Sequence, residues 1–196
     1  MTRVKAAICL MLGWVGLLWL LEGVDYAGGN ALDTFGIQPR DFGELADVVP
    51  AAFLHFGFGH LAANSLPLLL LGFIAVLRSG VRRFLAVVLL IIVASGLGVW
   101  LTAAPNSNTA GASGVVFGLF GYLLVRGFIE RKALDIGIGL AVGVAYGSIV
   151  WGALPSDSGI SWQGHLFGLI GGVLAAFAFR QRPRAVTAGA TVRPVP

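Results

Sequence analysis

Residues 105–118 read PNSNTAGASGVVFG, a polar loop that turns through Gly-Ala-Ser-Gly into an apolar helix. Ser113 stands among small residues at the point where this helix begins. Serine often caps helices and glycine lets helices approach closely, so this stretch alone favours a structural role. The alternative is that Ser113 is a nucleophile. The residues on the other apolar segments decide between these two interpretations.

The composition predicts a polytopic membrane protein. Of the 196 residues, 57% are hydrophobic and 11% are charged, whereas soluble domains carry roughly 25% charged residues. Several apolar runs approach the length of about 20 residues that a membrane-spanning helix needs. We expect an all-α, six-helix bundle at 6–180, with a short N-terminus at 1–5 and a disordered cytoplasmic tail at 181–196. The predicted spans are about 6–23, 51–77, 84–103, 113–129, 134–153 and 163–179.

The charges predict the orientation of the bundle. Of the 13 Lys and Arg residues, all but Arg40 fall on one side of this arrangement. The positive-inside rule then places both termini in the cytoplasm. The net charge of +4 is scattered between the spans and not gathered in a patch, which argues against a nucleic-acid partner. Cys9 is the only cysteine, so an internal disulfide and a cysteine metal site are excluded.

Three polar residues are predicted to lie at one depth in the membrane. Counted from the Arg near the cytoplasmic end of each span at about 1.5 Å per residue, Asn64, Ser113 and His165 all lie about 20 Å from that end. In a hydrocarbon core of about 30 Å, this level is about 10 Å below the outer surface. His60 lies one turn nearer the outside on the face that carries Asn64. Polar and ionisable residues inside a membrane are costly, so this cluster favours a functional site.

These residue types fit serine hydrolysis. Ser113 would be the nucleophile, and His165 the general base that takes its proton. His60 and Asn64 would donate to an oxyanion together with backbone N–H groups at the start of the fourth span. No carboxylate is placed at this depth, so the sequence predicts a dyad. His55 and His60 are five residues apart, which is poor spacing for a shared ligand set and argues against a metal.

Glycines predict close contact between the fourth and sixth spans. Gly114 and Gly118 are four residues apart, and Gly168 is followed by Gly172 at the same spacing. Such stripes of small residues let helices touch and would bring the serine and the histidine together. Generic membrane packing explains these glycines equally well.

Other interpretations of the polar residues compete with catalysis. His60 and Asn64 could be hydrogen-bonding residues between helices, and His165 could be a structural or proton-relay histidine. His55 lies nearer the outer interface and is interpreted first as a loop-fixing or packing residue. A small transporter would use the same groups as a polar pathway, but it would need polar residues at many depths.

Three motifs resemble those of the rhomboid intramembrane serine proteases. They are HFGFGHLAANSLPLLLLG (55–72), GASGVVFG (111–118) and GHLFGLIGG (164–172). The family pattern is His-xxx-Asn on the second span, Gly-x-Ser-Gly opening the fourth and His-xx-Gly-xxx-Gly on the sixth. The resemblance covers about 6–180 and implies the minimal six-span bacterial-type form, a multi-pass protein of the plasma (inner) membrane.

The resemblance implies a role for each matching residue. By this resemblance, Ser113 is the nucleophile and His165 the general base. His60, Asn64 and the Ser113 backbone N–H are then expected to line an oxyanion hole. Members of this family cleave membrane-spanning proteins near their outer ends without a metal or cofactor. The implied partners are therefore transmembrane substrates and the lipid bilayer. The glycines implied to shape the turn or pack the helices are Gly111, Gly114, Gly118, Gly168 and Gly172.

Two positions depart from the family pattern. Many members carry Tyr four residues after the serine, where this chain has Phe117, which can stack on the histidine but cannot hydrogen-bond. Many also carry Trp-Arg in the first loop, where this chain reads GELADVVP at 43–50. An inactive rhomboid-like protein that binds membrane helices is the alternative. Such relatives typically lose the serine or the histidine, and this chain keeps both.

Overall fold

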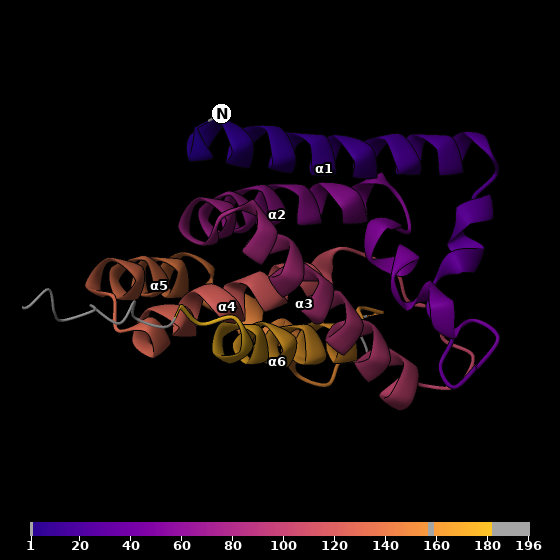
Figure 1. The fold of residues 1–196 in the computed structure, drawn as a ribbon. Coiled ribbons are helices and arrows are strands. Elements are labelled where there is room, and N and C mark those ends of the chain that lie inside the picture. The colour runs from indigo at the N-terminus through magenta and orange to yellow at the C-terminus, as the bar shows by residue number, and fades with distance from the viewer. Residues whose placement is uncertain (1, 157–158, 182–196) are drawn as a thin grey trace, which may run out of the picture.

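The structure is a computed structural model that describes residues 2–156 and 159–181. Within those residues the chain is helical apart from loops and one isolated bridge between Ile37 and Thr109. Figure 1 shows the long helices as one bundle. The long helices are α1 (Arg3–Ala27), α2 (Phe58–Ser79), α3 (Val81–Thr102), α4 (Ser113–Glu130), α5 (Ala133–Tyr146) and α6 (Trp162–Ala178). The 3-10 helices are η1 (Ala31–Phe35), η2 (Leu45–Val48), η3 (Pro50–Phe53) and η4 (Gly147–Ala153).

The helices identify an integral, multi-pass membrane protein and confirm the predicted all-α fold. Five helical segments within the described residues are long and apolar enough to cross a bilayer, counting α5 and η4 together as Ala133–Ala153. The sixth, α6, is equally apolar but has only 17 residues. Of the tail predicted at 181–196, only Gln181 is described, and residues 182–196 lie outside the described residues, as does Met1.

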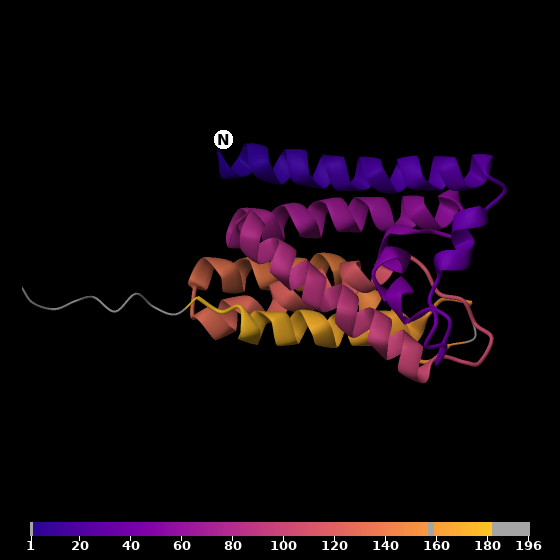
Figure 2. The same cartoon turned by 45° about the vertical axis from the view of Figure 1, so that its right-hand side comes forward.

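Helix α4 lies at the centre of the bundle. In Figures 1 and 2 it is enclosed by the other helices, while α1 lies at the edge beside α2. Within an apolar stretch of 18 residues in each helix, 67% of the residues of α4 are buried inside the protein, against 22% for α1 and 17% for the α5–η4 segment. A helix that is apolar all round is suited to this place, because neighbouring helices and not lipid cover it.

Glycines bring α4 and α6 into backbone contact. A Cβ atom on Gly168 would overlap the carbonyl oxygen of Gly114, and one on Gly172 would overlap that of Gly118. The absent side chains of Gly114 and Gly118 face α3 instead, because their Cβ atoms would overlap Ser95 and Ile91. Gly168 and Gly172 on α6 therefore make room for α4, whereas Gly114 and Gly118 on α4 make room for α3.

The second span begins later than predicted. Helix α2 begins at Phe58 and not near residue 51, because η3 ends at Phe53 and an irregular segment follows it. Gly57 in that segment has φ +97°, a conformation that breaks a right-handed helix and favours glycine. His55 therefore lies outside α2. In contrast, α2 and α3 are joined by Gly80 alone, so the third span begins at Val81 and not near residue 84.

The segment between α1 and α2 is ordered against the loop that precedes α4. Ile37 and Thr109 exchange two backbone hydrogen bonds, and Trp100 Nε1 donates to the Asp41 carbonyl at 2.9 Å. Arg40 donates to the carbonyl at Ala103 near the end of α3, at 3.0 Å. Figure 2 shows these segments together at one end of the bundle. Arg40, the one basic residue predicted on this side, thus stabilises the loop structure.

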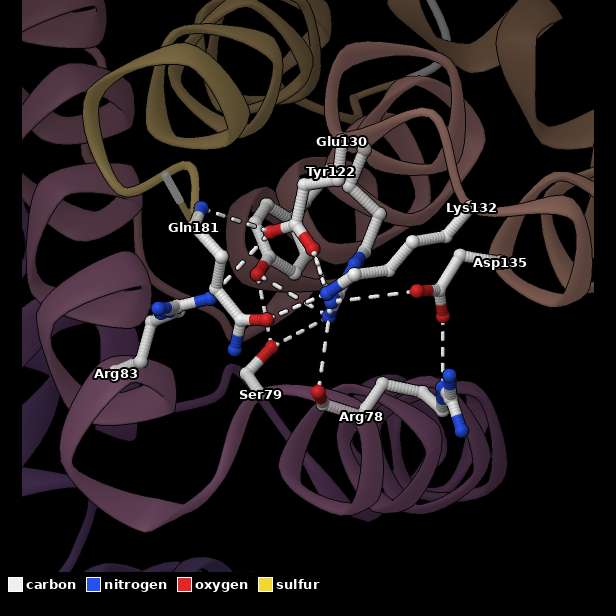
Figure 3. Close-up of polar contacts among 9 residues, drawn as sticks. Arg78, Ser79, Arg83, Tyr122, Glu130, Lys132, Asp135 and Gln181 are labelled. Carbon is white, nitrogen blue, oxygen red and sulfur yellow. Dashed lines mark hydrogen bonds and ion pairs between the residues drawn. The ribbon is translucent and has the colours of Figure 1, made fainter. Parts of the chain in front are cut away.

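A buried ionic cluster lies where α2 and α4 end and α5 begins, and Figure 3 shows its side chains. Arg126 of α4 is 1% exposed and donates to Ser79 Oγ at 2.7 Å. Its Nη2 lies 3.3 Å from Glu130 Oε2 and 3.6 Å from Asp135 Oδ2. Arg78 of α2 also binds Asp135, at 2.7 Å. The cluster therefore ties α4 to α2 and α5 at this end.

The same cluster reaches α3 and the segment that follows α6. Glu130 Oε1 lies 3.4 Å from Arg83 of α3 and accepts the Gln181 backbone N–H at 3.3 Å. Lys132 lies 2.7 Å from Glu130 Oε2. Buried charges require such compensation, since an isolated one in an apolar interior is strongly unfavourable.

Candidate active site

Ser113 is the first residue of α4 and faces a cavity. The helix cap is Ala112, so Ser113 does not occupy the N-cap position. The cavity has a volume of about 820 Å³, and its lining includes Ser113, His60, Gly111 and Trp162. Ser113 therefore lines the cavity and is not the N-cap of α4, the structural role that its sequence context first suggested.

His165 stands in the first turn of α6 with a defined tautomer. Ser161 caps this helix by accepting the Gly164 N–H at 3.2 Å. His165 Nδ1 lies 2.8 Å from the Gly152 carbonyl oxygen. A carbonyl only accepts, so Nδ1 carries the proton, and in the neutral ring Nε2 then keeps its lone pair. Nε2 is buried and has no hydrogen-bond partner within the described part of the chain.

Helix packing brings His165 to the face of α4 that carries Ser113. The His165 ring stacks on Phe117 with centroids 4.0 Å apart and planes inclined by 7°. Phe117 follows Ser113 by four residues and therefore lies on the same helix face. Next to this pair, a Cβ on Gly114 would lie 3.2 Å from the Gly164 carbonyl oxygen. The structure thus brings together the two helix beginnings that the sequence predicted to meet.

His60 and Asn64 occupy successive turns of α2. The His60 ring lies against Gly111, where a Cβ would come within 2.7 Å of His60 Cε1. Gly111 has φ +139°, so glycine is required there for conformation as well as for space. Asn64 is 6% exposed, and its Nδ2 donates to the His60 carbonyl at 3.0 Å. The amide has a second N–H that this bond does not use.

His55 contacts both the nucleophile loop and His60. Its Nε2 accepts the Ala112 N–H at 3.2 Å, and its ring meets that of His60 edge-on with centroids 5.2 Å apart. Burial, and next the charge of His60, lower the pKa of His55 to about 4. His55 is therefore neutral at pH 7. This matches its interpretation as a loop-fixing residue.

Two groups at the site were not found from the sequence. One is the Gly152 carbonyl on η4, a main-chain atom that leaves no sequence signal. The other is Ser95 of α3, which lines the cavity and donates to the Gly164 carbonyl at 2.8 Å. A polar residue inside the apolar third span was a usable signal for Ser95. Among the described residues, no group of three or more His, Cys, Asp or Glu side chains is arranged to hold a metal ion.

The chain is similar in sequence to a known family of membrane proteins and to several of its members. Residues 43–182 match the Rhomboid domain family. An uncharacterized protein of Mycobacterium tuberculosis (strain ATCC 25618 / H37Rv) is 43% identical over 175 residues, covering 85% of this chain and 72% of the relative. Rhomboid protease GlpG of Yersinia pestis (strain Pestoides F) is 34% identical, covering 66% of this chain and 46% of the relative. Rhomboid protease GluP of Bacillus subtilis (strain 168) is 32% identical, covering 76% of this chain and 29% of the relative.

The fold and the cavity define a helical, multi-pass membrane protein with a polar site built where α4 and α6 begin. This chain belongs to the rhomboid family, as the match over most of its length establishes.

Proposed function

We propose that the protein is an intramembrane serine endopeptidase that uses Ser113 and His165 as a dyad. The observation that carries this proposal is the state of His165. Its Nδ1 is bonded to Gly152, its ring is stacked on Phe117, and its Nε2 is buried without a partner in the described chain. A histidine held in this way is suited to act as a base for a nearby hydroxyl. Family membership and the protease relatives support the same class of activity.

The first half of the reaction forms an acyl-enzyme. Ser113 Oγ attacks the carbonyl carbon of the peptide bond while His165 Nε2 takes the hydroxyl proton. The negative charge that develops on the carbonyl oxygen is met by the Ser113 N–H and by the His60 and Asn64 side chains. His165 then returns its proton to the leaving amine, and the C–N bond breaks.

The second half releases the product. A water molecule attacks the acyl carbon while His165 Nε2 takes its proton. His165 then returns this proton to Ser113 Oγ as the bond between the acyl carbon and Oγ breaks. The Gly152 carbonyl replaces the carboxylate of a triad, because it holds Nδ1–H throughout and leaves Nε2 as the only basic nitrogen. No external reagent other than water is required.

The orientation follows from charge. With both termini in the cytoplasm of a bacterial plasma membrane, the loop at 103–112 and the cavity lie on the outer side. Substrates would then be transmembrane proteins cut near their outer ends, where water reaches the cavity. The apolar residues exposed on α1 and α5 face lipid in this arrangement, including Leu20 and Val144.

A serine-directed fluorophosphonate probe tests the proposal. We expect the protein purified in detergent to be labelled and Ser113→Ala and His165→Ala to be unlabelled. We also expect Asn64→Ala to lower turnover of a cleaved transmembrane peptide by roughly 10- to 1000-fold, as for the loss of one oxyanion donor. Labelling that persists in Ser113→Ala, or wild type that stays unlabelled in lipid as well as in detergent, would reject the assignment and favour an inactive helix-binding relative.

A further inference from the structure

The two amides that precede Ser113 are both bound by the segment before α2. The Gly111 N–H donates to the Ala51 carbonyl at 2.8 Å, and the Ala112 N–H donates to His55 Nε2 at 3.2 Å. Ser113 is the next residue and the first of α4, so its N–H has no acceptor within the helix. Of these three successive amides, the first two are therefore bound by the segment before α2, and the third belongs to the residue that lines the cavity.

His55 is the side chain that makes this arrangement. It is 2% exposed and lies between η3 and α2, outside any long helix. Accepting an N–H through Nε2 requires a lone pair there, so Nδ1 carries the proton and the ring is neutral. The same ring meets His60 edge-on, and His60 in turn lies against Gly111. One imidazole thus contacts the nucleophile loop and a proposed oxyanion donor together.

Resting on the proposed function, we infer that His55 is a positioning residue: it holds the Ala112 amide and the His60 ring and so sets the distance between the Ser113 N–H and the His60 side chain. His55 does not touch the reacting atoms in this role. It orients two donors that come from different helices and would otherwise move independently. Such donors stabilise charge only if they are held in place before the reaction begins.

Loss of this positioning should slow the reaction of Ser113 with the probe and leave binding of the probe unchanged. A glutamine amide can place an acceptor near the position of Nε2, whereas the shorter asparagine amide cannot reach the Ala112 N–H. We expect His55→Asn to lower the maximal rate of fluorophosphonate inactivation by roughly 10- to 100-fold, as a misplacement of about 1 Å can. The probe concentration at half-maximal rate should change by less than about twofold, because the cavity itself is unaltered. His55→Gln should keep the rate within about threefold of wild type.

Hydrogen exchange of the Ala112 amide measures the contact without using activity. Exchange should be slow in wild type and in His55→Gln, and faster in His55→Asn at equal thermal stability. The inference is overturned if His55→Asn reacts like wild type, if His55→Gln loses as much as His55→Asn, or if the Ala112 exchange rate is the same in all three. If wild type itself is not labelled, the proposed function fails. Faster exchange of the Ala112 amide in His55→Asn than in wild type would then show that His55 only anchors the loop.

Discussion

The ring of His165 lies parallel to the ring of Phe117, with centroids 4.0 Å apart. Phe117 is on α4 and His165 on α6, so the stack joins the helix that carries the proposed nucleophile to the helix that carries the proposed base. The ring plane of the histidine is set by this contact and by the Gly152 carbonyl together. One restraint is an aromatic side chain and the other a main-chain carbonyl, so each is changed by a different substitution.

The stack predicts the effect of removing the Phe117 ring. In Phe117→Leu the imidazole loses a flat surface while the site stays apolar, so we expect kcat to fall about 10-fold with KM nearly unchanged. Phe120→Leu is the matched control, because Phe120 is also buried on α4 and, among the described residues, its ring is not stacked on His165. Turnover of a transmembrane peptide well below each variant's Tm is the measurement. Equal losses in the two variants would mean that the Phe117 ring acts only through stability.

The Gly152 carbonyl predicts a second effect on the same histidine. A Cβ on Gly152 would lie 3.0 Å from Phe117 Cζ and 3.3 Å from His165 Nδ1, so in Gly152→Ala the imidazole, the Phe117 ring or η4 has to shift by a few tenths of an ångström. We expect kcat to fall roughly 10-fold or more. Nitrogen-15 NMR of the labelled histidine should show that the Nδ1–H tautomer is no longer dominant. Gly147→Ala on the same segment has open space around it and should behave as wild type. An unchanged tautomer in Gly152→Ala would remove the carbonyl from the site.

Backbone contact between α4 and α6 predicts a stability effect. Gly172→Ala places a methyl group against the Gly118 carbonyl, where no side chain can yield. Overpacking of this kind typically costs about 1–3 kcal/mol. Gly16→Ala on α1 is the control, since nothing lies within 4 Å of the position of its Cβ. Thermal unfolding in detergent should show a lower Tm for Gly172→Ala alone. A Tm equal to that of the control would contradict this packing.

The ionic cluster predicts a larger loss of stability, when one of its charged side chains is removed, than the overpacking at Gly172 does. Arg126→Met leaves Glu130 and Asp135 with fewer compensating charges in a buried place. Breaking a buried ion pair from one side costs about 3–5 kcal/mol. Arg82 is exposed on α3, so Arg82→Met should change the Tm little. If the two variants unfold at the same temperature, Arg126 is not a stabilising centre of the cluster.

The buried, neutral His55 predicts a pH dependence of stability. Its pKa is about 4 in the folded protein and 6.5 as a free side chain. Between these values the unfolded chain binds a proton that the folded protein does not, so this contribution to stability falls as pH drops from 6.5 towards 4. The loss is of the order of 3 kcal/mol at full extent. The difference in Tm between wild type and His55→Gln, followed from pH 7 to pH 4, should therefore shift in favour of the variant. A constant difference would show that His55 is not buried as a neutral imidazole.

The membrane fold and the set of polar candidates could be predicted from residue type and spacing. The apolar runs predicted six spans, and five helical segments among the described residues are long enough to cross a bilayer. Ser113, His60, Asn64 and His165 stand out because polar groups are unfavourable in lipid. The beginning of α2 was predicted wrongly because the apolar residues of η3 continue the hydrophobic run. The extended conformation of Leu54 and the positive φ of Gly57 separate η3 from the helix.

The sequence by itself determined the segments that span the membrane and the chemistry available in them, since both depend on side-chain type and local order. The tertiary structure alone decided which groups hold the side chains and amides of the site in place. The Gly152 carbonyl meets His165 from 13 residues away, and His55 meets the Ala112 amide from 57 residues away. A main-chain carbonyl is present in every residue, and a histidine's partner depends on how the loops close over the helix ends. Such contacts arise from the packing of distant segments, which hydrophobic patterns do not encode.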